Sequence, residues 1–176
     1  KFEKKFAKLI GTKYAVGVNS GTDAIKLSLK LIGIKPGDEI ITAANTFVAT
    51  VGAICELGAV PVFVDCDDSF CMNVDQVETK ITKKTKAIVP VHFTGYMTNM
   101  VKLNKISKKY NIPVVEDACQ SILASINNKN SGTWSDFGAF SLHPLKNINV
   151  WSDGGVIVTS NKKYYEHLKL LRNHGL

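Results

Sequence analysis

The sequence predicts an α/β fold in which a mostly parallel sheet of seven strands lies between layers of helices. Two features of the sequence lead to this prediction. Short apolar runs that are rich in β-branched residues alternate along the chain with patterns typical of amphipathic helices. The apolar runs also show little alternation with polar residues, which is typical of strands that helices cover on both faces.

The individual elements follow from this alternation in chain order. A first helix is indicated by Phe2, Phe6 and Leu9, which lie on one face at helical spacing. The predicted strands are Tyr14–Val18, Glu39–Thr42, Val60–Asp65, Ala87–Val91, Pro113–Glu116, Gly138–Ser141 and Gly155–Thr159. The predicted helices between and after them are Thr22–Leu31, Phe47–Leu57, Val74–Lys80, Met100–Tyr110 and Lys162–Asn173.

The composition is that of one globular domain. Apolar residues make up 45% and charged residues 21% of the 176 residues, which is enough for a sizeable core. The longest uncharged apolar runs have only the length of a strand, so no membrane span is expected. The first residues do not resemble a signal peptide. Because the chain opens in a helix and stops directly after another, we expect it to be a piece of a longer protein.

Charge and cysteine content narrow the classes of partner. The formal charge of +7 comes almost wholly from lysines that are spread over helix faces and turns. They do not interleave with aromatic residues, so nucleic-acid binding is not expected, whereas attraction of a phosphorylated small molecule is. No Cys-x-x-Cys motif and no ligand-spaced histidine is present, so no metal site is expected. We interpret these cysteines as reduced thiols of a cytoplasmic protein: Cys55, Cys66, Cys71 and Cys119.

Polar residues that follow the strands are candidates for a ligand site, because parallel sheets bind ligands at the carboxyl ends of their strands. After the first strand, Ser20, Gly21 and Thr22 open a helix whose N-terminus can bind an anion, with a simple helix cap as the alternative. After a later strand come Glu116 and Asp117. A carboxylate there can orient a cation or a protonated ring nitrogen, or serve only in a cap or a structural salt bridge.

Two further residues extend this set. Phe47 follows the second strand and can stack on a flat ligand, although a phenylalanine at the start of a helix is more often part of the core. Lys146 follows an apolar strand end five residues after Ser141, where an ammonium group is costly unless its charge is neutralised or used. A lysine, a carboxylate, a helix N-terminus and an aromatic plate are together what pyridoxal 5′-phosphate (PLP) requires.

The chain resembles the DegT/DnrJ-type family of PLP-dependent nucleotide-sugar aminotransferases, in the fold-type I aspartate aminotransferase superfamily. The stretches that carry the resemblance occur in the family's order: VGVNSGTDAIKLSLKLIGIKPGDEIITAANTFVATVGAI, GAVPVFVDCD, TKAIVPVHFTG, VVEDACQS, FGAFSLHPLKNINVWSDGGVIVT and LRNHG. The resemblance implies a three-layer sandwich, the PLP-binding large domain of fold type I. It also implies that residues 1–176 are that domain in incomplete form, without the small C-terminal domain that family members carry.

The resemblance further implies roles at matching positions. Lys146, in the pattern S-x-x-x-x-K-N, would form the internal aldimine with PLP. Asp117, in E-D-A-x-Q, would pair with the pyridinium nitrogen, and Gln120 would contact the 3-hydroxyl of the ring. Phe47 would stack on the ring. The phosphate would bind at the helix start, near Asp23, to the following residues: Ser20, Gly21, Thr22 and Ser141.

The implied activity is transfer of an amino group from glutamate to a nucleotide-linked keto-sugar, by a homodimer in polysaccharide biosynthesis. Lys146 favours this activity, since some related dehydratases carry histidine at that position. The alternatives are a family-like fragment that is inactive or regulatory, a PLP-dependent sugar dehydratase and, least favoured, a plain nucleotide-binding domain, which would lack its phosphate motifs. For several residues the sequence does not distinguish a role in lining the substrate pocket from a structural role: His92, Tyr96, Trp134, His143 and Trp151.

Overall fold

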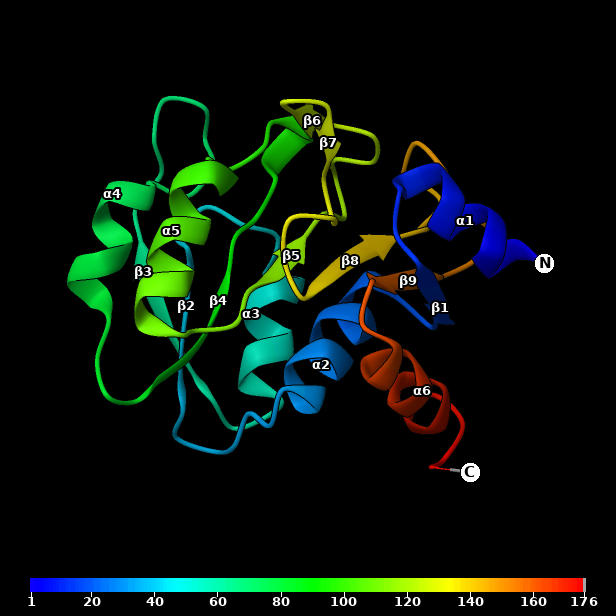
Figure 1. The fold of residues 1–176 in the computed structure, drawn as a ribbon, viewed down its shortest axis with the longest axis horizontal. Helices are drawn as coiled ribbons and strands as arrows, with labels where there is room; N and C mark the ends of the chain where they lie inside the picture. The colour runs from blue at the N-terminus through cyan, green and yellow to red at the C-terminus, as the bar shows by residue number, and fades with distance from the viewer. Residues whose placement is uncertain (176) are drawn as a thin grey trace.

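A computed structural model describes residues 1–175 of the chain. Its elements are α1 (Phe2–Ile10), β1 (Tyr14–Val18), α2 (Gly21–Leu31), β2 (Glu39–Ala43), α3 (Val48–Cys55), β3 (Val60–Val64), α4 (Val74–Val77), η1 (Glu78–Lys80), β4 (Thr85–Val89), η2 (Phe93–Gly95), α5 (Met100–Tyr110), β5 (Val115–Asp117), β6 (Ser125–Ile126), β7 (Lys129–Asn130), β8 (Phe137–Ser141), β9 (Gly155–Thr159) and α6 (Lys162–Leu171). Figure 1 shows them with the chain running from blue to red.

The predicted strands are all present, but they divide into two hydrogen-bonded sheets. One sheet has four strands in the order β1-β9-β8-β5, and the other has three strands in the order β3-β2-β4. Isolated parallel bridges between Ile88 and Val114, and between Val91 and Asp117, connect β4 with β5. The α/β class is therefore confirmed, whereas the single seven-stranded sheet is not.

Proline residues explain why the ladder between β4 and β5 is interrupted. The Ile88 N–H donates to the Pro113 carbonyl, and the Asp117 N–H donates to the Pro90 carbonyl. In a parallel ladder, alternate residues of each strand donate to the other strand, so Pro90 in one segment and Pro113 in the other each remove one such bond. The other neighbours are parallel except around β9, which runs antiparallel to β1 and β8. The prediction of a mostly parallel arrangement is confirmed.

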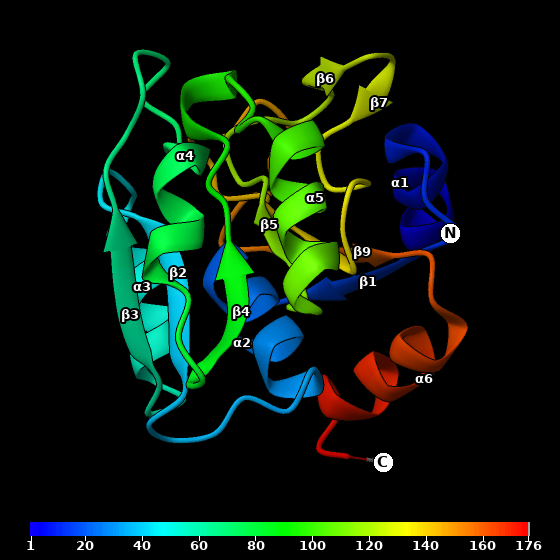
Figure 2. The same cartoon turned by 60° about the vertical axis from the view of Figure 1, so that its left-hand side comes forward.

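Helices cover both faces of the sheets and give the expected three layers. Figure 2 shows α4 and α5 in front of β3, β2 and β4, with α3 behind them. One core cluster joins the strands to α2, α3 and α6, and two others join them to α4 with α5 and to α1. Neighbouring strand residues enter opposite clusters, as Ile40 and Ile41 do, because side chains alternate across a sheet.

Element boundaries differ from the prediction in a few places. The helix predicted from Phe47 begins at Val48, because Phe47 is an extended N-cap residue with φ −65° and ψ 142°. The helix predicted over Val74–Lys80 is α-helical only to Val77 and continues as a 3-10 turn. The short hairpin of β6 and β7 was not predicted. Its turn residues, Asn127 and Asn128, have positive φ angles of 52° and 60°, which asparagine tolerates better than most residues.

Candidate active site

The register of the central strands gathers the candidate residues at one end of the sheet. Val18, the last residue of β1, pairs with Gly155 at the start of β9, and Gly155 pairs on its other side with Ser141 at the end of β8. One strand further along, Ala139 pairs with Asp117. The segment after β1, the end of β8 and the end of β5 therefore lie side by side.

The N-terminus of α2 forms the anion-binding part of this site. The hydroxyl oxygen of Ser20 accepts a hydrogen bond from the Asp23 N–H at 3.0 Å, so Ser20 does cap the helix. A side chain at Gly21 would place its Cβ 2.7 Å from the Cys119 sulfur and 2.9 Å from the Ser141 Cβ. A side chain at Gly155 would overlap the backbone of Ser20. These close approaches leave the N–H groups of the first helical turn facing the strand ends.

A pocket of about 230 Å³ opens beside this helix start. Most of the predicted site residues line it, since Ser20, Gly21, Thr22, Phe47, Gln120, Ser141 and Lys146 all face it. His143, which the sequence left open between a pocket role and a structural one, also lines it, as do three residues that the sequence did not single out for this role: Cys119, Leu145 and Asp153. Asp23, which was expected near the phosphate, lies outside this lining and pairs with Lys26 at 2.9 Å.

Lys146 reaches the pocket from a tight turn after β8. The Lys146 N–H donates to the His143 carbonyl at 2.8 Å, and the Leu145 N–H donates to His143 Nδ1 at 3.2 Å. The His143 N–H donates in turn to the Ser141 hydroxyl oxygen at 3.2 Å. His143 thus holds the turn that presents the half-buried lysine, and its imidazole lies on the pocket wall.

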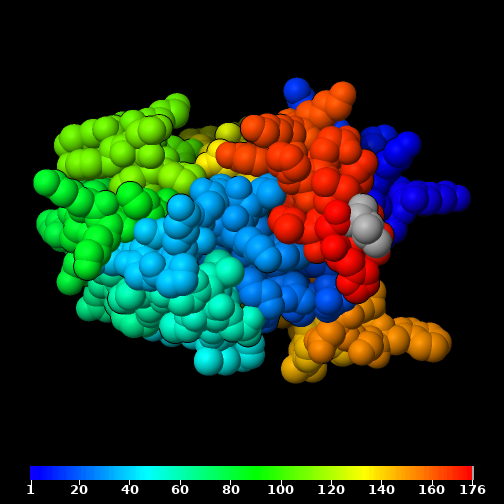
Figure 3. Space-filling model, turned by 90° about the horizontal axis from the view of Figure 1, so that it is seen from below, coloured from blue at the N-terminus to red at the C-terminus, as the bar shows by residue number. Residues whose placement is uncertain are grey.

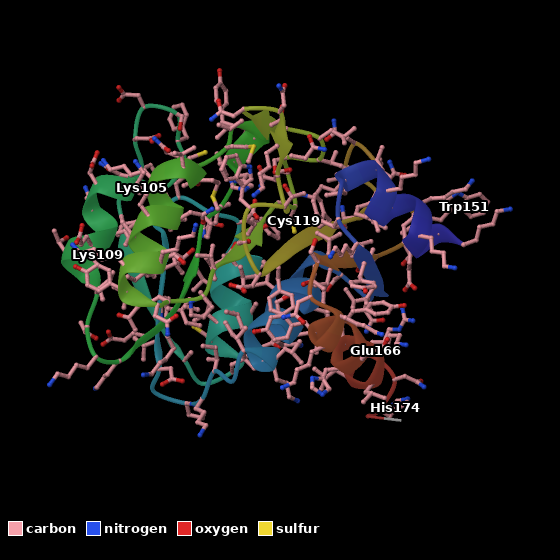
Figure 4. The ribbon with its side chains drawn as sticks, in the orientation of Figure 1. Lys105, Lys109, Cys119, Trp151, Glu166 and His174 are labelled. Carbon is pink, nitrogen blue, oxygen red and sulfur yellow. The ribbon has the colours of Figure 1, made fainter. Side chains whose placement is uncertain are left out.

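Asp117 lies beneath the pocket rather than on its lining. Its side chain is buried, and its Oδ2 accepts a hydrogen bond from the Thr50 hydroxyl at 2.7 Å. Its Oδ1 accepts from the Cys119 N–H at 3.1 Å. The pKa of the Cys119 thiol is raised well above its ordinary value by burial and by the Asp117 carboxylate, while the Lys146 ammonium opposes the shift. Cys119, labelled near the middle of Figure 4, therefore lies within the fields of both groups.

Phe47, at the start of α3, and Gln120, in the segment after β5, both line the pocket. The Phe47 side chain is 64% exposed, so the alternative that it belongs to the core is wrong. The Gln120 Oε1 accepts a hydrogen bond from the Thr94 N–H at 2.9 Å, which fixes the orientation of its amide. The assignment of Phe47 to a ring face and of Gln120 to a ring hydroxyl stays a prediction.

Glu116, the other carboxylate at this strand end, points away from the pocket. Its oxygens accept hydrogen bonds from His92 Nε2 at 3.0 Å, Gly132 N at 2.7 Å, Trp134 N at 2.8 Å and Ser135 Oγ at 2.8 Å. His92 is also fully buried, and its Nδ1 accepts from a backbone N–H, so the ring is the neutral tautomer that donates through Nε2. Glu116 and His92 therefore stabilise the fold and do not take part in the pocket.

The remaining open residues fall outside the pocket lining. Trp134 packs against the core near α5, and its Nε1 donates to the Lys129 carbonyl at 3.0 Å. Tyr96 is exposed, and Trp151 is fully exposed at the edge of the molecule in Figure 4. Within residues 1–175, no group of three or more metal-ligating side chains is found, and no helix is long and apolar enough to cross a membrane.

A larger hollow of about 650 Å³ lies elsewhere, between the end of α2, the segment before β4 and the end of α5. Lys35, Thr82 and Ile112 are among its lining residues, and it shares none with the pocket around Lys146. It lies beside the residues that precede the strands, where parallel sheets do not usually bind ligands. The chemistry-bearing residues are therefore concentrated in the smaller pocket.

A lysine, a buried carboxylate and a helix N-terminus at the strand ends of an α/β domain define the class of PLP-binding domains. The family model of the DegT/DnrJ/EryC1/StrS aminotransferases matches residues 1–176, and the chain belongs to this family. It is 43% identical over 174 residues to a UDP-N-acetyl-3-dehydro-α-D-glucosamine 3-aminotransferase of Acidithiobacillus ferrooxidans, covering 98% of this chain and 47% of that protein.

Solved structures agree with this assignment. The crystal structure of DesV from S. venezuelae in complex with a ketimine intermediate has a TM-score of 0.97 and 39% identity, over 99% of this chain and 47% of that one. GDP-4-keto-6-deoxy-D-mannose-3-dehydratase from E. coli, with bound hydrated PLP, has a TM-score of 0.92 and 35% identity, over 99% of this chain and 46% of that one. The chain thus spans about half the length of the relatives it matches.

The residues around the pocket fit PLP. The α2 N-terminus and the hydroxyls of Thr22 and Ser141 suit a phosphate, and the two glycine approaches described above keep this cradle open. Lys146 supplies an amine on the wall of the same pocket, and Asp117 supplies a buried carboxylate that is hydrogen-bonded to the lining residue Cys119. These are the groups that the aldehyde and the ring nitrogen of PLP require.

Proposed function

We propose that the protein is an aminotransferase that uses PLP to move an amino group from glutamate to a nucleotide-linked keto-sugar. We also propose that residues 1–176 form the cofactor-binding domain of this cytoplasmic enzyme. The observation that carries the proposal is the half-buried Lys146 in a pocket with the α2 N-terminus, beside the buried carboxylate of Asp117 that holds the lining residue Cys119. A lysine with a purely structural role does not require an anion-binding helix terminus and a buried carboxylate next to it.

Each residue has a separate task in this proposal. PLP, when bound, supplies an aldehyde that links to amines and a ring that takes up electron density from the carbon losing a proton. Lys146 Nζ would hold the cofactor through its aldehyde carbon. As a free amine, Lys146 would be the base that takes up and returns the proton of the donor's α-carbon.

The other residues bind and orient. Asp117 accepts a hydrogen bond from the ring nitrogen and keeps it protonated, which increases the electron demand of the ring. The first turn of α2, with Ser20 and Ser141, holds the phosphate. Phe47 covers one face of the ring and keeps water from it, and Gln120 orients the ring through its 3-hydroxyl.

The test is the visible absorbance of the purified chain with PLP, before and after addition of glutamate. We expect a yellow colour that glutamate bleaches. Lys146→Ala is expected to lose the colour, whereas Lys105→Ala, on the exposed face of α5 far from the pocket (Figure 4), is the matched control and keeps it. Persistent colour and turnover in Lys146→Ala would contradict the role of this lysine.

A sugar dehydratase is the second candidate, because the E. coli dehydratase named above shares the fold at a TM-score of 0.92. Lys146 favours amino transfer, since its amine can both link to the cofactor and move protons. Product analysis with a keto-sugar and glutamate distinguishes the two. Formation of an amino sugar with 2-oxoglutarate supports the aminotransferase, and a deoxy sugar without net amination supports the dehydratase.

We further propose that the enzyme is a homodimer with an interface beside the pocket. Leu145 is 88% exposed and Trp151 is fully exposed, although both are apolar and flank Lys146. Figure 3 shows their segment, in gold and orange, projecting from the body of the molecule. Exposed apolar side chains gathered at one place are typical of interaction sites. Sedimentation of the chain and of a Leu145→Ser/Trp151→Ser variant tests this proposal, since we expect the variant to shift toward the monomer.

A further inference from the structure

The buried hydroxyl of Thr50 is the best-placed polar group for which neither the sequence nor the proposed function has accounted. Thr50 is fully buried in α3, whose sequence VATVGAIC contains no other polar hydroxyl or charged side chain. Its Oγ1 donates to Asp117 Oδ2 at 2.7 Å, across from a helix to the end of β5. This contact joins a residue of the outer layer directly to the carboxylate beneath the pocket.

A buried hydroxyl in a helix has a simpler way to satisfy its hydrogen bonding. Ser28, which is also fully buried, donates to the Ala24 carbonyl one turn earlier in α2 at 2.7 Å. Thr50 instead directs its single proton at a side chain of another element. The two hydroxyls are equally withdrawn from water, but only one of them acts on a residue of the site.

The hydroxyl of Thr50 is itself held in direction. Its oxygen lies 2.7 Å from the Thr46 hydroxyl oxygen. Because the Thr50 proton is directed at Asp117, Thr46 is the donor in that second contact, which is much shorter than its other contact, 3.4 Å to the Phe47 carbonyl. The result is a directed chain from the half-buried Thr46 through the buried Thr50 to Asp117, and successive hydrogen bonds of this kind strengthen one another.

The carboxylate of Asp117 is fixed from two layers of the fold. Thr50 holds Oδ2 from α3, and the Cys119 N–H holds Oδ1 from the segment after β5 at 3.1 Å. With one donor on each oxygen, the plane of the carboxylate has little freedom to rotate. Phe47 is the N-cap residue of the same helix, and its carbonyl accepts the Thr50 N–H at 3.1 Å. The aromatic plate and the carboxylate are therefore aligned by one rigid element.

We propose that Thr50 is a positioning residue that orients Asp117 toward the ring nitrogen of the cofactor, with Thr46 orienting Thr50 in turn. This inference rests on the proposed function. Thr50 does not touch the cofactor, and it acts by keeping the carboxylate in the orientation that holds the nitrogen's proton. Loss of the hydrogen bond from Thr50 to the charged Asp117 should lower turnover about tenfold to a hundredfold, because hydrogen bonds to charged groups are among the stronger ones.

The experiment compares Thr50→Val, which keeps the shape but removes the hydroxyl, with Thr50→Ser, which keeps the hydroxyl. Ser28→Ala is the matched control for a buried helix hydroxyl with no link to Asp117. Each variant is loaded with PLP labelled at the ring nitrogen. The nitrogen NMR signal then reports whether that atom carries a proton, beside kcat, KM and the melting temperature.

We expect Thr50→Val to shift the nitrogen signal toward the unprotonated form and to lower kcat about tenfold to a hundredfold, with KM little changed. Thr50→Ser should keep most of the protonated nitrogen signal and most of kcat, and Ser28→Ala should change only the melting temperature. An unchanged nitrogen signal in Thr50→Val, or an equal loss in Thr50→Ser, would overturn the inference. If Thr50→Val does not fold, Thr50→Cys takes its place. Its S–H is a weaker donor than a hydroxyl, so Thr50→Cys should show the same loss relative to Thr50→Ser to a smaller extent.

The outcome for the proposed function is separate. If the unaltered chain does not hold PLP through Lys146, the proposed function fails and the inference about Thr50 fails with it. If the unaltered chain holds PLP and Thr50→Val leaves the protonation of the ring nitrogen unchanged, only the role of Thr50 is overturned.

Discussion

Glu116 and Asp117 are adjacent in one strand, yet they belong to two different regions of the molecule. Glu116 lies on the sheet face toward α5, in a buried cluster with His92 and the loop at residues 132–135. Asp117 lies on the face toward α3, with Thr50 on one side and the pocket residue Cys119 on the other. Strand alternation alone separates them, because successive side chains leave a strand on opposite faces.

The difference teaches how one strand end can serve stability and chemistry at the same time. Each Glu116 oxygen accepts hydrogen bonds from two donors, so its bonding capacity is used within the protein. Each Asp117 oxygen accepts from one donor, which leaves capacity for a ligand. A saturated carboxylate locks loops together, whereas an unsaturated one is available for a cofactor.

The largest effect is expected from Glu116→Ala. The change leaves several donors around a buried site without an acceptor, and we expect the free energy of unfolding to fall by about 1–3 kcal/mol for each buried donor left unpaired. Urea denaturation followed by circular dichroism measures it. Glu116→Gln, which keeps the shape, should lose less. A loss below about 1 kcal/mol in Glu116→Ala would show that the cluster is not the structural region of this comparison.

The next effect is expected from Asp117→Ala, on rate instead of stability. We expect PLP to stay bound and turnover to fall about a hundredfold or more, because the ring nitrogen loses the group that keeps it protonated. Single-turnover absorbance with glutamate measures the rate. Undiminished turnover would remove the electronic role of Asp117, and a loss of stability as large as that of Glu116→Ala would erase the contrast between the two carboxylates.

The thiol of Cys119 offers a sharper probe of the same contrast. Since the negative charge of Asp117 helps to raise the pKa of this thiol, Asp117→Asn should lower that pKa and speed alkylation of Cys119 at mildly alkaline pH. Glu116→Gln, on the opposite face, should leave the rate unchanged. Mass spectrometry measures the alkylation rate of Cys119 in the two variants, with the exposed Cys55 as the internal reference. Equal rates in the two variants would contradict the separation.

The same thiol makes stability depend on pH with a defined sign. The folded chain holds the Cys119 proton more tightly than the unfolded chain does, because its pKa is raised in the fold. This contribution is present below the ordinary pKa of a thiol and is lost as pH rises toward the raised value. Cys119→Ala should therefore show a shallower alkaline decline in melting temperature. An unchanged decline would mean that other groups, such as Cys71, whose pKa is also raised, dominate it.

The smallest effect is expected from Ser135→Ala. This change removes a single donor from Glu116 and leaves the others, so the loss should be about 0.5–1.5 kcal/mol. Cofactor binding and turnover should not change, in contrast to Thr50→Val on the other face. A fall in turnover from Ser135→Ala at unchanged stability would join the two regions that the comparison separates.

The sequence alone predicted much of this arrangement. Apolar runs placed the strands, and the resemblance to the family selected Lys146 and Asp117, which the fold brings to one end of the sheet. From the residues alone, Glu116 and Asp117 were indistinguishable, because a strand buried on both faces has no polar alternation to fix its phase. Residue type alone favoured the core for Phe47, whereas the resemblance to the family placed it against the ring. Its position as N-cap of α3 leaves it exposed beside the pocket.

Contacts between distant segments could not be read from the sequence. Thr50 was missed, since its partner lies 67 residues away, and the only local signal was one hydroxyl in an otherwise apolar helix. The division of the sheet followed from Pro90 and Pro113, whose positions in facing strands became apparent only once the strands were paired. Such features depend on register, which propensity and pattern do not determine.

The position of β9 has a consequence for the order of events during synthesis. Within residues 1–175, β1 pairs with β9 alone, a strand made about 140 residues later, and Gly155 of β9 packs against the backbone that opens α2. We therefore expect the anion cradle, whose residues are made early, to be completed only when β9 has been made and inserts between β1 and β8. Contacts of such long range form late and slowly. Capture of the cofactor should accordingly mark completion of the sheet, not its beginning.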